Sequence, residues 1–200
     1  MRFSPPSWTA NPANVSRAVV VGCSGSGKTT LSRCLARALR AAHVELDAIF
    51  NLPGWAAREQ EEMTAIVAQR VGAERRWVVD GNYLWLAETT WPAADVIVFL
   101  DLDRVTILRR VIIRSLYRAI FRRRLWNGNR QAWSTLCSTN PRKSIIALAW
   151  QRQPHYRTHY RTMLTGVYGA KMVHLTSPRA VRAFLRAVSD RSDGSAGGQA

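Results

Sequence analysis

The stretch of the chain with the clearest chemistry is residues 22–29, which read GCSGSGKT. This is a complete G-x-x-x-x-G-K-[ST] pattern, in which glycines let the backbone turn tightly and bring its N–H groups against phosphate oxygens. In such a loop Lys28 reaches the β- and γ-phosphates of a nucleotide, and the Thr29 hydroxyl ligates Mg²⁺. The pattern therefore predicts ATP and Mg²⁺ as cofactors, with the following residues around the phosphates: Gly22, Ser24, Gly25, Ser26, Gly27, Lys28, Thr29 and Thr30.

The segments on both sides of this loop match what a phosphate-binding loop requires. Residues 17–21 (RAVVV) have the composition of a buried strand, and residues 30–39 carry apolar side chains at the spacing of an amphipathic helix. A helix that begins at the lysine adds the partial positive charge of its N-terminus to the site. A chance match in a Gly/Ser loop would not come with strand, loop and helix in this order.

Apolar runs alternate with helical patterns along the rest of the chain. Short apolar strands separated by helices are typical of a parallel sheet covered on both faces. We therefore expect an α/β fold, a three-layer α/β/α domain with a five-stranded parallel sheet and ligands at the carboxyl ends of its strands. The strands are predicted at 18–21, 43–46, 77–79, 96–100 and 171–175, and the helices near 28–41, 56–72, 103–125, 131–165 and 178–188.

Two hundred residues suit one domain, which we place at residues 16–188, with a basic helical insertion over about 104–165 as a candidate lid. Residues 1–15 and the Ser/Gly/Asp-rich residues 189–200 are expected to be a flexible leader and a flexible tail. No apolar stretch approaches the ~20 residues of a membrane span, and the three cysteines show no metal spacing. These features favour a cytoplasmic protein with no membrane partner, and no obligate protein partner is evident.

The formal net charge is +16, and every basic residue other than Lys28, Lys143 and Lys171 is an arginine. The planar guanidinium fork suits phosphate groups, so the excess indicates polyanionic ligands, either nucleotides or nucleic acid. A GC-rich coding sequence is an alternative source of the high Arg/Lys ratio, although it does not explain the net charge.

Acidic residues stand at the predicted carboxyl ends of three strands. Asp80 follows the apolar run 77–79, and such an acid typically holds Mg²⁺, with an Asp-Gly turn as the alternative. Asp101 is a rival metal acid, although we favour it as the cap of the helix that begins near Arg104. Asp47 is either a catalytic residue that accepts the proton of an attacking hydroxyl or a turn residue.

Arg110, Arg114, Arg118 and Arg122 are spaced four apart, so in a helix they form a column along one face. Like charges in a column repel, and a bound anion would relieve this repulsion, whereas a solvated face is the alternative. Arg110 and Arg114 are the expected catalytic clamp on the phosphates. Arg118 onward is the expected solvent face or partner surface, through which nucleic acid binding is possible.

A second pair of arginines, Arg157 and Arg161, lies four apart in the run HYRTHYR. Tyr156 and Tyr160 in the same run either stack on a base or, as we favour, pack in the core. Three tryptophans that follow strand ends, Trp55, Trp85 and Trp91, are candidates for lining a substrate pocket. The residues expected to contact the acceptor are Asp47, Gly81, Asn82, Tyr83, Arg157 and Arg161.

The loop at residues 22–30, Leu46-Asp47, Val79-Asp80-Gly81 and the Arg110…Arg114 pair together resemble adenylate-kinase-like P-loop kinases. In that family an Asp-Gly pair lies beside the metal and the acceptor, and an R-x-x-x-R pair opening a mobile lid contacts ATP. The resemblance implies those roles for Asp80, Gly81, Arg110 and Arg114. Over residues 17–188 the chain looks most similar to the bacterial group labelled DNA topology modulation protein (FlaR-related), through LDAIF, PGW, WVVDGNY and LWNGNR.

The chain departs from adenylate kinases directly after the Asp-Gly pair. Those enzymes continue with Phe-Pro-Arg, whose arginine grips the acceptor phosphate, whereas this chain has Asn82-Tyr83-Leu84. The acceptor is therefore left open. The expected function is transfer of the γ-phosphoryl of Mg-ATP to a small acceptor. The alternatives are a nucleic-acid-associated ATPase, a nucleotide-dependent DNA- or RNA-binding protein, and a polynucleotide 5′-hydroxyl kinase.

Overall fold

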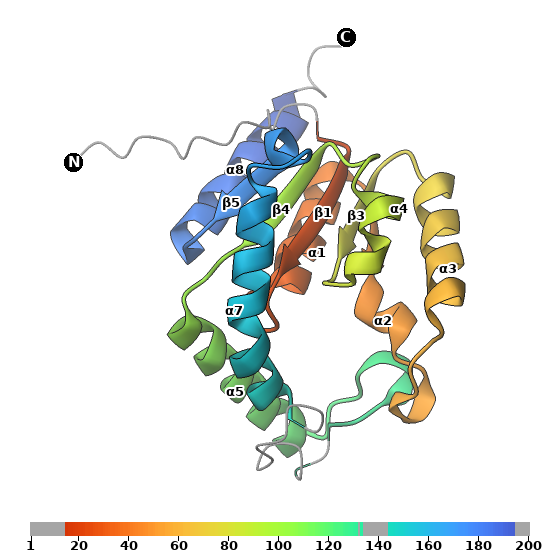
Figure 1. Cartoon of the computed structure of the whole chain (residues 1–200), viewed down its shortest axis with the longest axis vertical. Coiled ribbons are helices and arrows are strands. Elements are labelled where there is room, and N and C mark those ends of the chain that lie inside the picture. The colour runs from red at the N-terminus through yellow and green to blue at the C-terminus, as the bar shows by residue number, and fades with distance from the viewer. Residues whose placement is uncertain (1–14, 132, 134–143, 195–200) are drawn as a thin grey trace, which may run out of the picture.

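The computed structural model describes residues 15–131, 133 and 144–194. Their centre is a five-stranded, all-parallel sheet with the strand order β2-β3-β1-β4-β5 (Figure 1). This confirms the predicted α/β fold and its five strands. The strands are β1 (Arg17–Gly22), β2 (Ala42–Glu45), β3 (Trp77–Asp80), β4 (Val96–Leu100) and β5 (Met172–Leu175).

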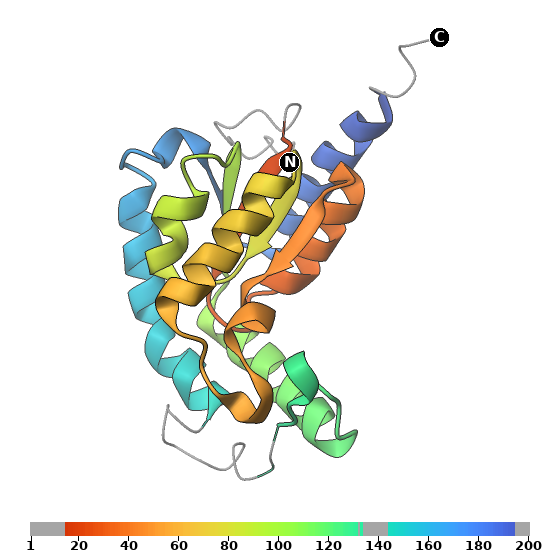
Figure 2. The same cartoon turned by 90° about the vertical axis from the view of Figure 1, so that its right-hand side faces the viewer.

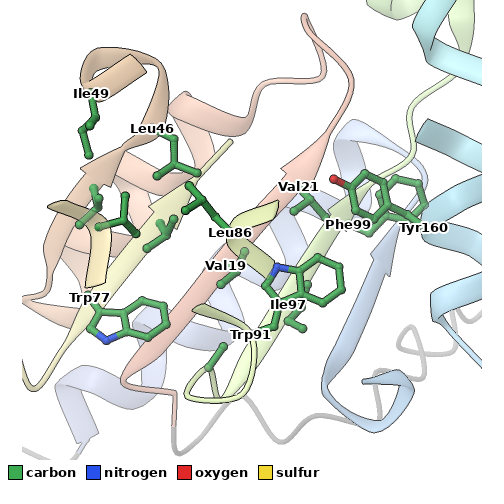
Figure 3. Close-up of a cluster of buried hydrophobic side chains, with 14 of the residues drawn as sticks. Val19, Val21, Leu46, Ile49, Trp77, Leu86, Trp91, Ile97, Phe99 and Tyr160 are labelled. Atoms are coloured by element: carbon green, nitrogen blue, oxygen red, sulfur yellow. The ribbon is translucent and has the colours of Figure 1, made fainter. Parts of the chain in front are cut away.

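Alternating side chains of the central strand β1 enter two separate cores, because successive residues of a strand point to opposite faces. Val19 and Val21 belong to the core drawn in Figure 3, where Trp77, Phe99 and Tyr160 lie around them. Ala18 and Val20 belong to the core on the other face. Both faces of the sheet are therefore covered, as expected for short, continuously apolar parallel strands.

The helices form the two outer layers of the α/β/α arrangement (Figures 1 and 2). Helices α1 (Lys28–Leu39) and α8 (Pro178–Gly194) pack together on one face. The other face is covered by α3 (Gln60–Ala73), α4 (Ala87–Thr90) and the C-terminal part of α7 (Ile145–Met163). The short α2 (Leu46–Phe50) directly follows β2.

Helix α5 (Arg104–Ile120) packs along α7 and extends beyond the carboxyl edge of the sheet (Figure 1). A third small apolar cluster joins the two helices, with Ile107 and Val111 of α5 against Ala149 of α7. The predicted lid region therefore begins as a helical pair built on the end of β4.

Several predicted helices are shorter than expected. Helix α1 ends at Leu39 rather than 41, because Arg40 takes a left-handed conformation with φ 50°. Helix α5 ends at Ile120 rather than 125, and α3 begins at Gln60 rather than 56. Of the helix predicted over 131–165, α7 occupies Ile145–Met163, and residues 132 and 134–143 lie outside the described part.

Helix α8 continues to Gly194, so its last residues overlap the tail predicted over 189–200. Residues 195–200, and residues 1–14 of the predicted leader, lie outside the described residues. Within the described residues, no helix has the length and apolar character needed to cross a membrane.

Candidate functional site

The loop between β1 and α1 depends on glycines in conformations that other residues avoid. Gly25 and Gly27 have φ values of 87° and 99°, in the left-handed region. A Cβ atom on Gly22 would lie 2.6 Å from the Leu100 carbonyl oxygen, and one on Gly25 would collide with Val111. The glycines of the sequence pattern are therefore required by backbone shape and by the close approach of β4 and α5.

Lys28, the first residue of α1, lies across this loop. Its Nζ donates hydrogen bonds to the carbonyl oxygens of Gly22 at 2.7 Å and Cys23 at 3.2 Å. Burial lowers the pKa of Lys28, while the charges of Asp47 and Asp80 oppose that shift. The ammonium group is thus held at the centre of the loop with two carboxylates nearby, where incoming phosphate oxygens would replace the carbonyl contacts.

The remaining loop residues line the same turn. The Ser26 hydroxyl is buried and has no hydrogen-bond partner among the described residues, which suits a group that contacts a ligand. Thr29 and Ser24 are half-buried, and Thr30 is exposed in the first turn of α1.

Asn82 connects β3 to the phosphate loop. Its Oδ1 accepts a hydrogen bond from the Gly22 N–H at 3.0 Å, and its Nδ2 donates to the Gly22 carbonyl oxygen. The Tyr160 hydroxyl also donates to Asn82 Oδ1, at 3.3 Å. Asn82 was expected at the acceptor, but the contacts of its amide in this structure are with the loop and with Tyr160.

Gly81 allows the end of β3 to approach α2 closely. Its φ is 150°, and a Cβ atom there would lie 2.8 Å from Leu46 Cβ. This contact brings α2, and with it Asp47, against the segment that follows β3. The positive φ and the close approach of the Leu46 side chain explain why a glycine follows Asp80.

Asp47 and Tyr83 meet at this junction. The Tyr83 hydroxyl donates a hydrogen bond to Asp47 Oδ1 at 2.8 Å. Burial raises the pKa of Asp47, against the opposing effects of Lys28 and of the Tyr83 hydrogen bond. Phe50 and Trp85 pack on the Tyr83 ring, with centroid distances of 5.0 and 5.1 Å. A carboxylate that has a raised pKa and interacts with the charge of Lys28 is suited to accept a proton.

Asp80 is the buried acid at the end of β3. Its Oδ2 has no hydrogen-bond partner among the described residues, and its Oδ1 lies 3.7 Å from His43 Nε2. An unpartnered carboxylate oxygen and the Thr29 hydroxyl are hard oxygen donors of the kind that Mg²⁺ prefers. The described residues contain no group of three or more His, Cys, Asp or Glu that could hold a metal.

Asp101 has a different role from the one favoured by the sequence. The cap of α5 is Asp103, whose carboxylate accepts a hydrogen bond from Thr106 N at 2.8 Å, so the prediction of Asp101 as the cap is wrong. Asp101 is instead surrounded by cationic or titratable groups: Arg157 Nε at 3.0 Å, Arg161 Nη2 at 2.8 Å and His174 Nε2 at 2.9 Å.

This arrangement makes the two candidate metal acids unequal. Burial acts to raise the pKa of Asp101, but hydrogen bonds from His174 and Arg161 outweigh it, and the pKa is lowered. Asp101 is thus neutralised by protein groups, which leaves Asp80 as the better candidate. Arg157 and Arg161, which were expected at the acceptor, direct their guanidinium groups to Asp101 in this structure.

The arginine column of α5 faces the site. Arg110 Nη1 donates to the Ser26 carbonyl oxygen at 3.0 Å. Arg114 is half-buried, its Nε has no partner among the described residues, and burial lowers its pKa against the attraction of Asp47. Arg118 was expected on the solvent face. It is half-buried, 5.9 Å from the Trp126 ring, and burial together with the charge of Arg114 lowers its pKa to about 10.

A loop that the sequence prediction missed returns from α5 to the opposite side of the site. We call residues 124–130 the bridging loop. Trp126 Nε1 donates to Glu45 Oε1 at 2.8 Å, Asn127 Nδ2 donates to the Ala48 carbonyl, and Asn129 Nδ2 donates to the Leu52 carbonyl. The signal in the sequence for this loop is the run WNGN, because Asn and Gly favour turns. In the structure Asn127 has a positive φ of 53°.

The tryptophans and tyrosines divide between the core and the site. Trp91 and Tyr160 are buried in the core beside Phe99, so the favoured interpretation of Tyr160 is confirmed and Trp91 does not line a pocket. Trp55 and Trp85 remain exposed, and Trp55 contacts Trp126 edge to face with centroids 6.4 Å apart.

Comparison with solved structures finds kinases of small molecules. A gluconokinase from Sinorhizobium meliloti 1021 aligns with 92% of this chain and 98% of its own, at 17% identity and a TM-score of 0.49. A shikimate kinase from Acinetobacter baumannii aligns with 89% of this chain and 95% of its own, at 18% identity and a TM-score of 0.49. A shikimate kinase from Bacteroides thetaiotaomicron has a TM-score of 0.44 at 16% identity, over 88% of this chain and 97% of its own.

No protein-family model matches the chain. No curated protein matches it either. The narrower resemblance to the topology modulation group therefore stays a prediction. Structural likenesses of this size do not bear on activity, which has to be argued from the residues of the site.

Proposed function

We propose that this protein is an ATP-dependent phosphotransferase that transfers the γ-phosphoryl group of Mg-ATP to a hydroxyl of a small acceptor. The observation that carries the proposal is the hydrogen bond between Tyr83 and Asp47. The Asp47 carboxylate also lies close enough to Lys28 for their opposite charges to interact. A half-buried candidate base therefore interacts with the lysine of a loop that carries the complete phosphate-binding pattern. This combination suits phosphoryl transfer to a hydroxyl, because the acceptor must be oriented and lose its proton next to the γ-phosphate.

The charged groups of the loop and of α5 would stabilise the transferred group. Lys28, Arg110 and Arg114 would contact the β- and γ-phosphates, and catalysis would rest on positioning and electrostatics. Thr29 and Asp80 would hold Mg²⁺, which neutralises phosphate charge when it is bound. Asp47 would orient the acceptor hydroxyl and take its proton.

The acceptor would lie between α2, the segment after β3 and the bridging loop. Tyr83 and Gly81 support this position through their contacts with Asp47 and Leu46. The bridging loop is bonded to the last residue of β2, Glu45, and to Ala48 of α2. A site bounded on this side by the chain itself favours a small acceptor over a polymer.

No contact in the described residues favours the nucleic-acid alternative specifically. The column of Arg110, Arg114 and Arg118 is turned toward the phosphate loop and Trp126, so it is not an outward basic stripe. Arg122, Arg123 and Arg124 are exposed, but they are three residues at the end of one helix.

The direct test is release of ADP from Mg-ATP in the presence of a panel of acceptors. The panel contains nucleosides, nucleoside monophosphates, sugar acids and 5′-hydroxyl oligonucleotides. Release that depends on one class of small acceptor supports the proposal. Slow release that no small acceptor increases, but that DNA or RNA stimulates, contradicts it.

Two variants test the assigned roles. Lys28→Ala is expected to abolish turnover and to leave the fold intact. Lys171→Ala is the control, because the Lys171 ammonium bonds the Pro92 carbonyl oxygen and not the loop. Asp47→Asn is expected to lower kcat by ~100-fold or more, the usual contribution of a general base. Asp103→Asn is the control, because it removes the same charge and asparagine still caps a helix. This variant should retain activity.

A further inference from the structure

Helix α5 exposes an apolar face on the side opposite its arginine column. Helical residues advance by ~100° each, so Val105, Ile112, Ile113, Leu116 and Ile120 fall on one broad side. These five side chains, which we call the outer face, are between 40 and 76% exposed. Arg109 falls within the same face and is also exposed.

The outer face follows from how α5 is used on its inner side. Ile107 and Val111 pack against Ala149 of α7, and Arg110 bonds the phosphate loop. Because polar arginines occupy the side toward the site, the aliphatic residues are left on the side toward solvent. An exposed aliphatic strip on a long helix is unusual for a surface with no partner.

The charge around the outer face has a single sign. Segment 104–124 contains eight arginines and no acidic residue, and the chain has no Asp or Glu between Asp103 and Asp190. Arg122, Arg123 and Arg124 follow the helix directly and are exposed. The aliphatic strip is therefore bordered by positive charge, and the described part of α5 has no acid to balance it.

We infer that the outer face of α5 binds an anionic lipid surface, with the helix lying flat in the interface. Aliphatic side chains that enter the lipid and arginines that meet headgroup phosphates are the two features of such helices. The sequence-based expectation of no membrane partner rested on the lack of a spanning segment, which this mode of binding does not need.

Two other partners fit this surface less well. A nucleic acid would neutralise the arginines but would not bury five aliphatic side chains. A second copy of the chain would bury them but would bring two strongly basic segments together, which like-charge repulsion opposes.

The test is sedimentation of the full chain with vesicles. Vesicles of phosphatidylcholine containing about one third phosphatidylglycerol should bind the protein at least ~10-fold more strongly than phosphatidylcholine alone, because each arginine near an anionic surface adds to binding. The double variant Ile113→Ser/Ile120→Ser should weaken binding to the anionic vesicles by ~10-fold or more. Val167→Ser is the matched control, since Val167 is 96% exposed and lies after α7.

Each outcome is decisive. Wild-type protein that stays in the supernatant with anionic vesicles overturns the inference. Full binding of the double variant to anionic vesicles also overturns the inference, because the arginines alone would then account for the binding. A wild-type dimer in light scattering that the double variant abolishes would reassign the face to self-association. Neither isoleucine belongs to the proposed catalytic site, so ATP turnover checks that the double variant is folded.

Discussion

The Tyr83 hydroxyl donates a hydrogen bond to Asp47 Oδ1 at 2.8 Å, although the two residues are 36 positions apart in the chain. They follow the neighbouring strands β3 and β2, whose carboxyl ends lie together at Asp80 and Glu45. The bond orients one carboxylate oxygen and leaves the other available to an acceptor. It also lowers the pKa of Asp47, against the larger effect of burial, which raises it.

Replacing Tyr83 by Phe should therefore change the pH dependence of the reaction. Without the hydrogen bond the pKa of Asp47 rises further, so the acidic limb of the kcat/KM profile should move to higher pH. Turnover near neutral pH should fall by roughly tenfold to a hundredfold, the usual effect of losing one hydrogen bond to a charged group. Tyr117→Phe, on exposed Tyr117, is the control. An acidic limb that does not move would mean that Tyr83 does not act through Asp47.

Asp47→Asn should stabilise the free protein at neutral pH even though it removes activity. The folded-state pKa of Asp47 lies above its unfolded value, so its stabilising contribution is complete below the unfolded pKa. That contribution is lost as pH rises through the folded pKa. At neutral pH the variant should therefore unfold at a higher denaturant concentration than wild type. This difference between the two midpoints should shrink as pH falls toward about 4. A variant that is less stable than wild type at neutral pH would contradict the burial argument.

Arg114→Gln should lower kcat by ~100-fold with little loss of stability, as expected when a donor to a developing charge is removed. Its guanidinium is half-buried, and among the described residues it forms no ion pair, so removing the charge breaks none. Arg122→Gln is the matched control, since Arg122 is exposed and has left the helix with φ 45°. Steady-state kinetics on both variants checks this. Equal losses of kcat in the two variants would mean that the overall positive charge matters and that the position of Arg114 does not.

Asn82→Ala should lower the free energy of unfolding by ~1–3 kcal/mol, because it leaves the Gly22 N–H and carbonyl without the Asn82 amide. The KM for ATP should rise, since Gly22 begins the phosphate loop. Tyr160→Phe loses only the 3.3 Å bond to Asn82 and should have a smaller effect on both quantities. Urea denaturation and the KM for ATP provide the measurements. An unchanged KM for ATP would assign Asn82 to the acceptor instead.

Local patterns identified the phosphate loop and the strands because the responsible forces act over a few residues. Glycine conformation, the lysine at the start of α1 and apolar strands depend mainly on neighbouring positions. The five strands were all predicted, with differences of one residue or less at each end. Helix ends were predicted less well, because Arg40 and Arg122 end helices in left-handed conformations that glycine more often adopts.

The assignments that failed are those that depend on distant partners. Nothing local distinguishes Asp101 from Asp103. Asp103 nevertheless caps α5, whereas Asp101 forms ion pairs with His174 of β5 and with two arginines of α7. The bridging loop escaped prediction for the same reason, since its bonds join residues more than 70 positions apart.

By itself the sequence determined that this chain has an α/β/α domain whose β1–α1 loop carries the phosphate-binding pattern, since these features follow from local backbone preference and hydrophobic spacing. Only the tertiary structure decided which acids are available at the strand ends. Asp101 is neutralised by Arg161 and His174, whereas Asp80 keeps an unpartnered oxygen and Asp47 is oriented by Tyr83. The physical reason is that the state of a buried carboxylate is set by the charges and donors that the fold brings to it.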